Sequence, residues 1–248
     1  MATLGVAAAP EAGPRRAQLR LLNAFELVVG GKPVLLPLST QRLLVFVALH
    51  DYPVQRMYVA SSLWLDSPQE RAHANLRSTL WRIHRCGLHL VNVTGGRLSL
   101  DSRIVLDLRD AEALAHRVID GTSEIGAADV ATLACDLLPD WYDDWVLFER
   151  ERYRQLRLRA LEVACARLTE AGRVDDGLEA GLAAVASEPL RETAHRAVIR
   201  AHLAEGNAYE AVRQFQLCRR LLRDHLGIEP SLRTYELVRE VALPETLR

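Results

Sequence analysis

The chain has 248 residues, of which 49% are hydrophobic and 25% are charged, and its formal net charge at pH 7 is −1. This is the composition of a globular protein with room for one large domain or two ordinary ones. It excludes a disordered or fibrous chain, and no apolar run is long enough to span a membrane. We interpret residues 1–17 as a flexible tail. Its positive charges come at its end, whereas a secretory signal carries them at its start. The four cysteines form no CxxC pair, so we expect a protein of the reducing cytoplasm, associated with the nucleoid if it binds DNA.

The two parts of the chain differ in charge. Residues 15–104 carry 12 Lys and Arg against 5 Asp and Glu, a net of +7, whereas residues 105–248 carry 19 against 26, a net of −7. We interpret this as two domains with different partners, of which the first attracts a polyanion. Ordinary surface charge is the alternative. Because every basic residue except Lys32 is arginine, arginine abundance by itself proves little.

The first elements predicted along the chain are two strands. Gln18–Val29 alternates loosely between apolar and polar residues, and Lys32–Leu36 is a second short run. Gly30 and Gly31 lie between them, and two glycines between strand-like runs indicate a hairpin turn.

Two short helices are predicted next. Thr40–His50 is rich in apolar residues, and Ser39 in front of it is expected to cap the helix. The second helix is expected over Val59–Leu65, with Trp64 in the core.

A third helix is predicted from Ser67, as its N-cap, to about Cys86, with Pro68 at the first helical position. At about 100° per residue, four apolar residues fall on one narrow stripe that we expect to be buried: Ala72, Leu76, Leu80 and Ile83. The opposite face carries three cations, two small hydrogen-bonding residues and no acid: Arg71, Asn75, Ser78, Arg82 and Arg85. Arg77 and Trp81 are expected on the flanks of this face.

The clearest hairpin in the chain follows the third helix. Leu88–Thr94 and Arg97–Asp101 are strand-like runs joined by Gly95 and Gly96. The apolar positions of this hairpin are Val91, Val93, Leu98 and Leu100.

Two strands, three helices and a terminal hairpin over residues 18–104 predict a winged helix similar to the DNA-binding domain of response regulators. An α-helix fits the major groove of B-DNA, where Arg pairs two ways with guanine and Asn with adenine. The third helix is therefore expected to read bases with Arg71, Asn75, Ser78, Arg82 and Arg85. The DNA backbone or minor groove is expected to be contacted by Arg42, Arg56, Arg77 and Arg97. The alternative is an ordinary amphipathic helix with arginines on its solvated face.

Residues 105–248 are predicted to be α-helical and to contain a repeat. Gly172 and Gly206 are 34 residues apart, and a small residue, Gly177 or Ala211, follows each of them by five positions. A 34-residue period with a closing proline is typical of tetratricopeptide helix pairs, which stack on one another and usually bind proteins or dimerise. The predicted fold class is therefore mainly α with a small β part: an N-terminal winged helix followed by an all-α, tetratricopeptide-like domain.

Two stretches carry a resemblance to a known family. The first is Asp66–Arg71 leading into Asn75–Arg85, and the second is Leu138–Val146 with Glu188–Glu192 and Leu226–Ser231 behind it. Together they resemble the SARP regulators (Streptomyces antibiotic regulatory proteins), which pair a winged helix with a helical bacterial transcriptional activator domain. The resemblance covers about residues 18–241.

The resemblance implies a cytoplasmic actinobacterial activator. Members of the family commonly bind direct repeats upstream of biosynthetic genes, as a dimer or a side-by-side pair, and recruit RNA polymerase holoenzyme with its sigma factor. Large members add an ATPase and sensor part. Because this sequence has no GxxxxGK[ST] phosphate loop and no receiver domain, we expect a small member without nucleotide or phosphorylation control.

One cluster has the spacing of metal ligands. His84, Cys86 and His89 form an HxCxxH pattern, but His84 would lie in a helix and His89 in a strand, and no fourth ligand is near. We therefore predict no metal site.

A second cluster consists of acids around aromatic residues. Asp136, Asp140, Asp143 and Asp144 surround Trp141, Tyr142 and Trp145, and paired carboxylates can serve acid–base chemistry. No positioned histidine, nucleophile or phosphate loop accompanies them, so we predict no catalytic site and no cofactor. Packing is the favoured role of the aromatics, and a protein-contact patch of Trp141, Tyr142 and Trp145 is the alternative.

The sequence as a whole predicts a sequence-specific DNA-binding transcriptional activator that is not an enzyme. Its expected partners are double-stranded DNA, RNA polymerase holoenzyme and a second copy of the chain on DNA, with no membrane. The rival hypothesis is a tetratricopeptide-like interaction scaffold with weak, non-specific DNA binding.

Overall fold

A computed structural model describes residues 17–85 and 89–241. The predicted tail, apart from Ala17, lies outside the described residues, and so do Cys86 and Leu88. The chain divides into two compact units, one ending at Asp107 and the other beginning at Leu108. All the described strands lie in the first unit, and the regular elements described in the second unit are helices. This confirms the predicted mainly α fold class with a small β part.

The first unit opens with a sheet that the sequence predicted only in part. Its strands are β1 (Ala17–Arg20), β2 (Glu26–Val29), β3 (Lys32–Pro33) and β7 (Ile104–Leu106), in the order β3-β2-β1-β7. The single run predicted over Gln18–Val29 is wrong, because the chain turns back at Asn23, whose φ is 66°. Asparagine tolerates this left-handed conformation, so no glycine marks the turn. β7 pairs in parallel with β1; it begins at residue 104, the predicted end of the domain, and continues past it to Leu106.

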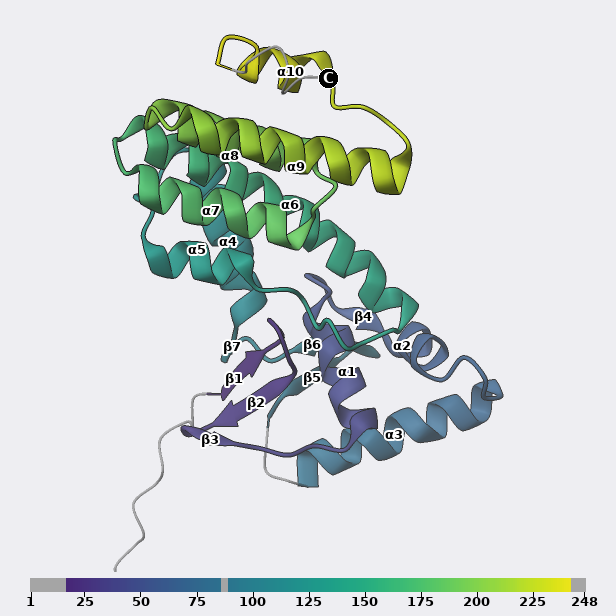
Figure 1. Ribbon diagram of the computed structural model, residues 1–248. Coiled ribbons are helices and arrows are strands. Elements are labelled where there is room, and N and C mark those ends of the chain that lie inside the picture. Colours follow the sequence, from purple (N-terminus) through teal and green to yellow (C-terminus); the bar gives the residue numbers. More distant parts are fainter. Residues whose placement is uncertain (1–16, 86–88, 242–248) are drawn as a thin grey trace, which may run out of the picture. The chain divides into compact units, whose positions relative to one another are not determined.

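Three helices follow the first strands (Figure 1). Helix α1 (Leu38–Ala48) begins before Ser39, so the predicted cap is wrong: the carbonyl of Pro37 accepts the first-turn N–H groups of Thr40 and Gln41. Helix α2 (Arg56–Leu63) begins three residues earlier than predicted. Trp64 follows α2 and is half-buried rather than a core residue.

Helix α3 (Gln69–Arg85) and the hairpin after it complete the winged helix. Strands β5 (Val91–Thr94) and β6 (Arg97–Leu100) pair antiparallel across Gly95 and Gly96, whose φ angles are 57° and 75°. Both glycines need the positive φ of a tight hairpin turn. Strand β4 (Val54–Gln55), which the sequence did not reveal, adds to β6 on the other side. Val93 is 43% exposed, so it is not one of the buried positions of the hairpin.

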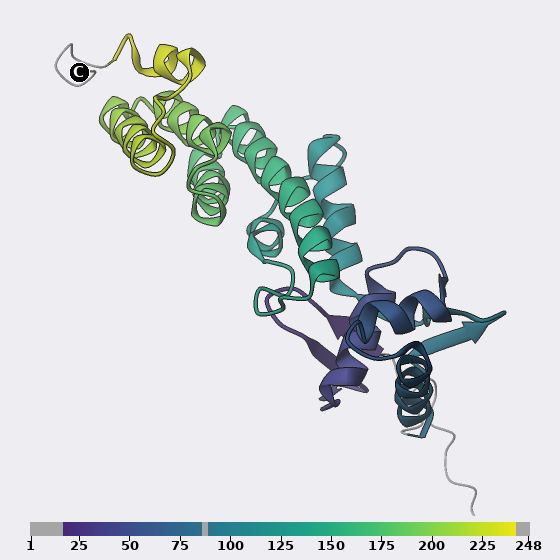
Figure 2. The same ribbon diagram turned by 90° about the vertical axis from the view of Figure 1, so that its right-hand side faces the viewer.

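The second unit is a stack of helices (Figure 2). They are α4 (Asp107–Ile119), α5 (Ala127–Ala134), α6 (Asp144–Glu170), α7 (Val174–Ser187), α8 (Glu192–Ala204), α9 (Ala208–Leu226) and α10 (Leu232–Val238). Tight turns lie between α6 and α7 and between α8 and α9, with longer connections on both sides of α5. The predicted repeat corresponds to the pairs α6–α7 and α8–α9. Gly172 and Gly206 lie in their turns with φ angles of 77° and 82°, a conformation that favours glycine.

Glycine on α7 lets three helices of the stack approach closely. A Cβ atom added at Gly181 would lie 2.8 Å from Val198 Cγ2 on α8 and 2.9 Å from Cys165 Sγ on α6. One added at Gly177 would lie 2.7 Å from Thr169 Oγ1. Both distances are shorter than packed side chains tolerate, so the spacing of these helices depends on the missing side chains.

We expect Gly181→Ala to destabilise the second unit by about 1 kcal/mol. Alanine is favoured over glycine in a helix by about 1 kcal/mol, but an extra methyl group in a packed core costs about 1–3 kcal/mol. Because Val198 and Cys165 are short and buried, they have little room to withdraw, so the overpacking is the larger effect. Urea unfolding measures the change. The control is Glu179→Ala on the exposed side of α7, which should stay within about 0.5 kcal/mol. A Gly181→Ala protein as stable as the wild type would contradict this packing.

A buried histidine joins α8 to its neighbours. His195 is fully buried, its Nε2 donates to the carbonyl of Pro189 at 2.9 Å, and its Nδ1 accepts from Gln214 Nε2 at 2.9 Å. The neutral ring, with its proton on Nε2, satisfies both bonds. Burial lowers the pKa of His195 below the ordinary value of histidine.

The stability of the second unit should therefore fall on acidification. A group whose pKa is lower in the folded than in the unfolded state contributes stability above its unfolded pKa, about 6.5 for histidine, and loses it as the pH falls towards the folded pKa. We expect His195→Gln to remove this loss between about pH 7.5 and pH 5.5, as urea unfolding would show. His225→Gln, at an exposed position, is the control and should retain the wild-type loss. An identical pH dependence in wild type and His195→Gln would refute this role for His195.

Candidate nucleic-acid interface

One side of α3 is packed into the first unit. The predicted stripe is confirmed, since Ala72, Leu76 and Ile83 are each 2% exposed and Leu80 is 5% exposed. Thr79 is buried with them and donates its hydroxyl hydrogen to the carbonyl of Asn75. This packing fixes the rotation of α3, so the side chains that it presents to solvent are determined.

The predicted base-reading residues are on or beside the exposed side of α3. Arg71, Ser78, Arg82 and Arg85 are exposed, together with Arg77 on the flank, but Asn75 is half-buried. At about 100° per residue, the point directly opposite the buried stripe lies between Ser78, Trp81 and Arg85. Asn75 is at the edge of the face, next to the stripe, and Trp81 is at its centre rather than on a flank.

Two of the arginines on α3 have contacts that orient them. Arg82 Nη1 donates to Ser39 Oγ in the first turn of α1 at 3.3 Å. The guanidinium carbon of Arg85 lies 5.0 Å from the centroid of the Trp81 ring, one turn earlier on the helix, which is the range of a cation–π contact. Arg42 is half-buried on α1, three residues after Ser39, so the structure brings Arg42 and Arg82 to the same end of α1.

The wing brings the other two predicted backbone contacts together. Arg97 begins β6 and pairs with Gln55 of β4, while the N–H of Arg56 donates to the carbonyl of Gly96 at 3.0 Å. Arg97 Nη1 donates to the carbonyl of Pro53 at 3.1 Å, which holds an exposed guanidinium against the base of the wing. The sequence did not reveal this juxtaposition, because it depends on the short pairing of β4 with β6.

The aromatic cluster of the second unit is partly packed and partly exposed. Trp141 and Trp145 are half-buried, whereas Tyr142 is 79% exposed and Phe148, in the first turns of α6, is 78% exposed. The guanidinium of Arg150 donates to the carbonyls of Leu137, Leu138 and Trp141, which fixes the segment leading into α6. Packing therefore accounts for part of this cluster, whereas the side chains of Tyr142 and Phe148 remain exposed.

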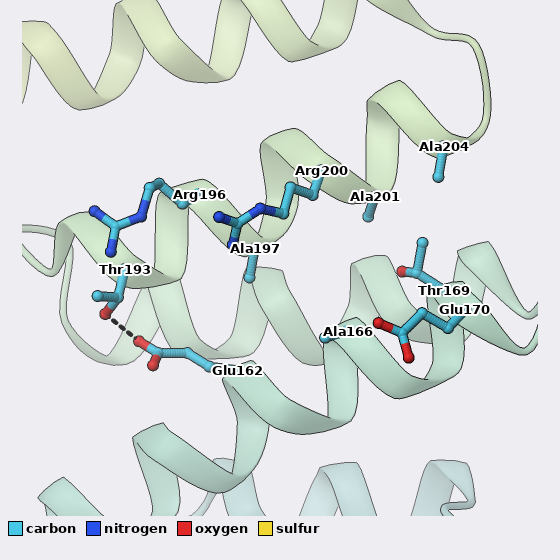
Figure 3. A pocket seen from close by; sticks show the side chains of 10 residues that line it. All are labelled: Glu162, Ala166, Thr169, Glu170, Thr193, Arg196, Ala197, Arg200, Ala201 and Ala204. Carbon is cyan, nitrogen blue, oxygen red and sulfur yellow. Dashed lines mark hydrogen bonds between the residues drawn. The ribbon is translucent and has the colours of Figure 1, made fainter. Parts of the chain in front are cut away.

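The same unit has a groove of about 450 Å³ between α6 and α8 (Figure 3). Glu162 and Glu170 line it from α6, and Arg196 and Arg200 line it from α8, with alanines of both helices between them. The carboxylate of Glu162 accepts hydrogen bonds from Arg191 and Thr193, and Arg196 pairs with Glu192. The groove thus has an acidic wall, a basic wall and an apolar floor.

The potential metal ligands of the described residues do not gather at one place. His84 and His89 are exposed, Cys86 of the same pattern lies outside the described residues, and residues 17–85 and 89–241 contain no group of three or more potential metal ligands. Burial raises the pKa of the Cys165 thiol to about 11 and that of Cys218 to about 12, so both stay protonated.

Comparison with known proteins assigns the chain to a family. Residues 106–242, more than half of the chain, match the family model of the bacterial transcriptional activator domain. Among solved structures, the chain is similar to Mycobacterium tuberculosis EmbR in complex with a low-affinity phosphopeptide, with a TM-score of 0.70 and 19% sequence identity over 94% of this chain and 68% of that chain. At 19% sequence identity, this similarity shows a shared fold and nothing further. The comparison with curated proteins gave no match.

In residues 17–85 and 89–241, no helix combines the length and the apolar character needed to cross a membrane.

A winged helix precedes the matched domain, which is the organisation that the resemblance to SARP regulators implies. The chain therefore belongs to the bacterial transcriptional activator domain family, as a transcriptional activator of the SARP type.

Proposed function

We propose that this protein is a sequence-specific DNA-binding activator that places α3 in the major groove. The observation that carries the proposal is the two-sided character of α3: one side is buried, and every exposed charge after its first turn is basic or a histidine. The proposed base-reading residues are Arg71, Asn75, Ser78, Arg82 and Arg85. The proposed contacts to the DNA backbone or minor groove are Arg42, Arg56, Arg77 and Arg97.

The geometry of the first unit supports this division of roles. An α-helix fits the width of the B-DNA major groove, and Arg there makes two hydrogen bonds to guanine. Arg56 and Arg97 lie at the wing and not on α3, so contact with phosphate or with a neighbouring minor groove is their expected role. Asn75 is half-buried, so its contact with adenine would come from the edge of the helix.

The second unit is proposed to contact RNA polymerase holoenzyme and to support a pair of chains on direct repeats. The proposed polymerase contact is the cluster of Trp141, Tyr142 and Trp145, because Trp and Tyr are frequent hot spots of protein interfaces. Tyr142 is 79% exposed, beside the half-buried Trp141 and Trp145. In transcription with purified holoenzyme, Tyr142→Ala should lower activation without weakening DNA binding, whereas Tyr209→Ala, 74% exposed on α9, should change neither.

Selection of bound DNA from a random duplex library by the full-length protein tests the DNA-reading proposal. At about 150 mM salt the screening length is about 8 Å, so long-range attraction is weak and base contacts dominate the selection. An enriched motif supports sequence-specific reading, and two half-sites in direct orientation support side-by-side binding. Absence of enrichment by folded protein contradicts the proposal.

Arg97→Ala should lower DNA affinity without changing base preference. Each phosphate contact releases counterions, so losing one should reduce the slope of log affinity against log salt by about 1. Arg103→Ala is a matched control, because Arg103 is exposed near the wing and is paired with Asp101. Fluorescence titrations at several salt concentrations give the slope. An unchanged slope in Arg97→Ala would remove Arg97 from the phosphate contacts.

A tetratricopeptide-like interaction scaffold is the second candidate function, and the groove between α6 and α8 favours it. Its charged walls and apolar floor are suited to an extended peptide. On this hypothesis DNA binding is weak and independent of sequence, so the same library selection separates the two functions.

A further inference from the structure

The exposed side of α3 contains a large aromatic side chain that the proposed reading residues do not include. Trp81 is 59% exposed, whereas Leu80 and Ile83 on the same helix are at most 5% exposed. An indole ring is among the largest apolar surfaces that a residue can bury, and left in water it contributes little to folding. Trp81 is therefore placed for a contact that forms only when a partner binds.

The surroundings of Trp81 indicate the charge of that partner. On a helix the neighbours of a side chain are the residues three and four positions away. For Trp81 these are Arg77, Ser78, His84 and Arg85, which include two cations and no acid. The guanidinium of Arg85 lies 5.0 Å from the centroid of the indole ring. An aromatic surface surrounded by cations is complementary to a polyanion and less so to the mixed charges of a protein surface.

We propose that Trp81 reads thymine through its 5-methyl group. This inference rests on the proposed DNA-reading function and deepens it. The thymine methyl is the apolar group that the major groove presents, and apolar side chains recognise it by contact. Because Arg85 stacks on the ring, the guanidinium is held beside the apolar contact and reads guanine in a neighbouring base pair. Trp81 is thus both a specificity-determining residue and a positioning residue for Arg85.

Replacement of thymine by deoxyuridine tests the proposal, since it removes the methyl group and leaves base pairing intact. The full-length wild type is first used to select an operator, and each thymine of that operator is then replaced singly. For the wild type, deoxyuridine at one thymine of each half-site should weaken binding about fourfold, the effect of one buried methyl-sized group. For Trp81→Ala, the penalty at that position should disappear while penalties at other positions stay as in the wild type.

Two further variants control for effects on folding. Trp81→Phe keeps an apolar ring and should retain the penalty, and Tyr209→Ala, which removes an aromatic residue 74% exposed on α9, should leave it unchanged. If Trp81→Ala keeps the same deoxyuridine penalty, or binds the operator as tightly as the wild type, the inference is overturned and a protein partner is the remaining role for the ring. If the wild type selects no operator, the proposed function fails and this inference fails with it.

Discussion

Arg85→Ala is expected to weaken binding to the selected operator by about 1–3 kcal/mol, roughly 5- to 150-fold, and to relax base preference at one position. Arg82→Ala should have an effect of the same size at a different position. The reason is that a bidentate pair between Arg and guanine distinguishes guanine from every other base in the major groove. Both guanidinium groups are exposed and already oriented, Arg85 by the ring of Trp81 and Arg82 by Ser39, so little rotamer freedom is lost on binding.

Arg20→Ala is the control for these variants, because Arg20 is exposed on β1 and paired with Glu26 in the same basic unit. It should change affinity slightly and base preference not at all. Far-UV circular dichroism verifies that each variant is folded, and library selection gives its base preference. If Arg82→Ala and Arg85→Ala still selected the wild-type sequence, the assignment of the reading face on α3 would be wrong.

Asp136→Ala should destabilise the second unit by about 3 kcal/mol, the largest effect on folding that we expect. The guanidinium of Arg157 on α6 is buried, with a side chain 2% exposed, and its Nη2 donates to Asp136 Oδ1 at 2.9 Å. Its Nη1 donates to Ser187 Oγ at 2.9 Å. Removal of the carboxylate leaves a buried charge without its counter-ion, which is more costly than loss of the attraction itself.

The same argument predicts an unequal effect of the two partners. Arg157→Met removes the buried charge, fills a similar volume and leaves Asp136, whose side chain is 40% exposed, accessible to water. It should therefore cost less stability than Asp136→Ala in urea unfolding. Asp140→Ala, at an exposed acid nearby, is the control and should stay within about 0.5 kcal/mol. A larger loss in Arg157→Met than in Asp136→Ala would contradict this account of the ion pair.

Long, strongly periodic segments of the chain could be predicted from the sequence. Helix α3 spans Gln69–Arg85, so its apolar spacing repeats over several turns and defines the buried stripe. The hairpin at Gly95 and Gly96 could also be predicted, because two adjacent glycines between strand-like runs are a strong local signal for a hairpin turn. Both glycines have the positive φ that such a turn needs. The repeat in the second unit was visible for a similar reason, since glycine marks equivalent turns at Gly172 and Gly206.

Features that depend on distant partners could not be predicted. Strand β4 is the pair Val54–Gln55, which has no pattern of its own and is defined by pairing with β6. The start of α2 at Arg56 is tied to the same pairing, through the carbonyl of Gly96. On α3, the apolar spacing predicts which side of the helix is buried, but it does not predict how far burial extends to the residues next to that side. For this reason the half-burial of Asn75 became clear only from the packing. The central position of Trp81 follows from the spacing of about 100° per residue itself, so its expected place on a flank was an error in applying the pattern.

The ratio of affinities for the selected operator and for a shuffled duplex of the same composition tests the central claim most directly. The measurement uses the full-length protein at about 150 mM salt, so that electrostatic attraction common to both duplexes cancels. A sequence-specific activator should bind the operator at least about 10³-fold more tightly than the shuffled duplex. A ratio near 1, with protein shown to be folded, would contradict sequence-specific reading by α3 and favour the interaction scaffold.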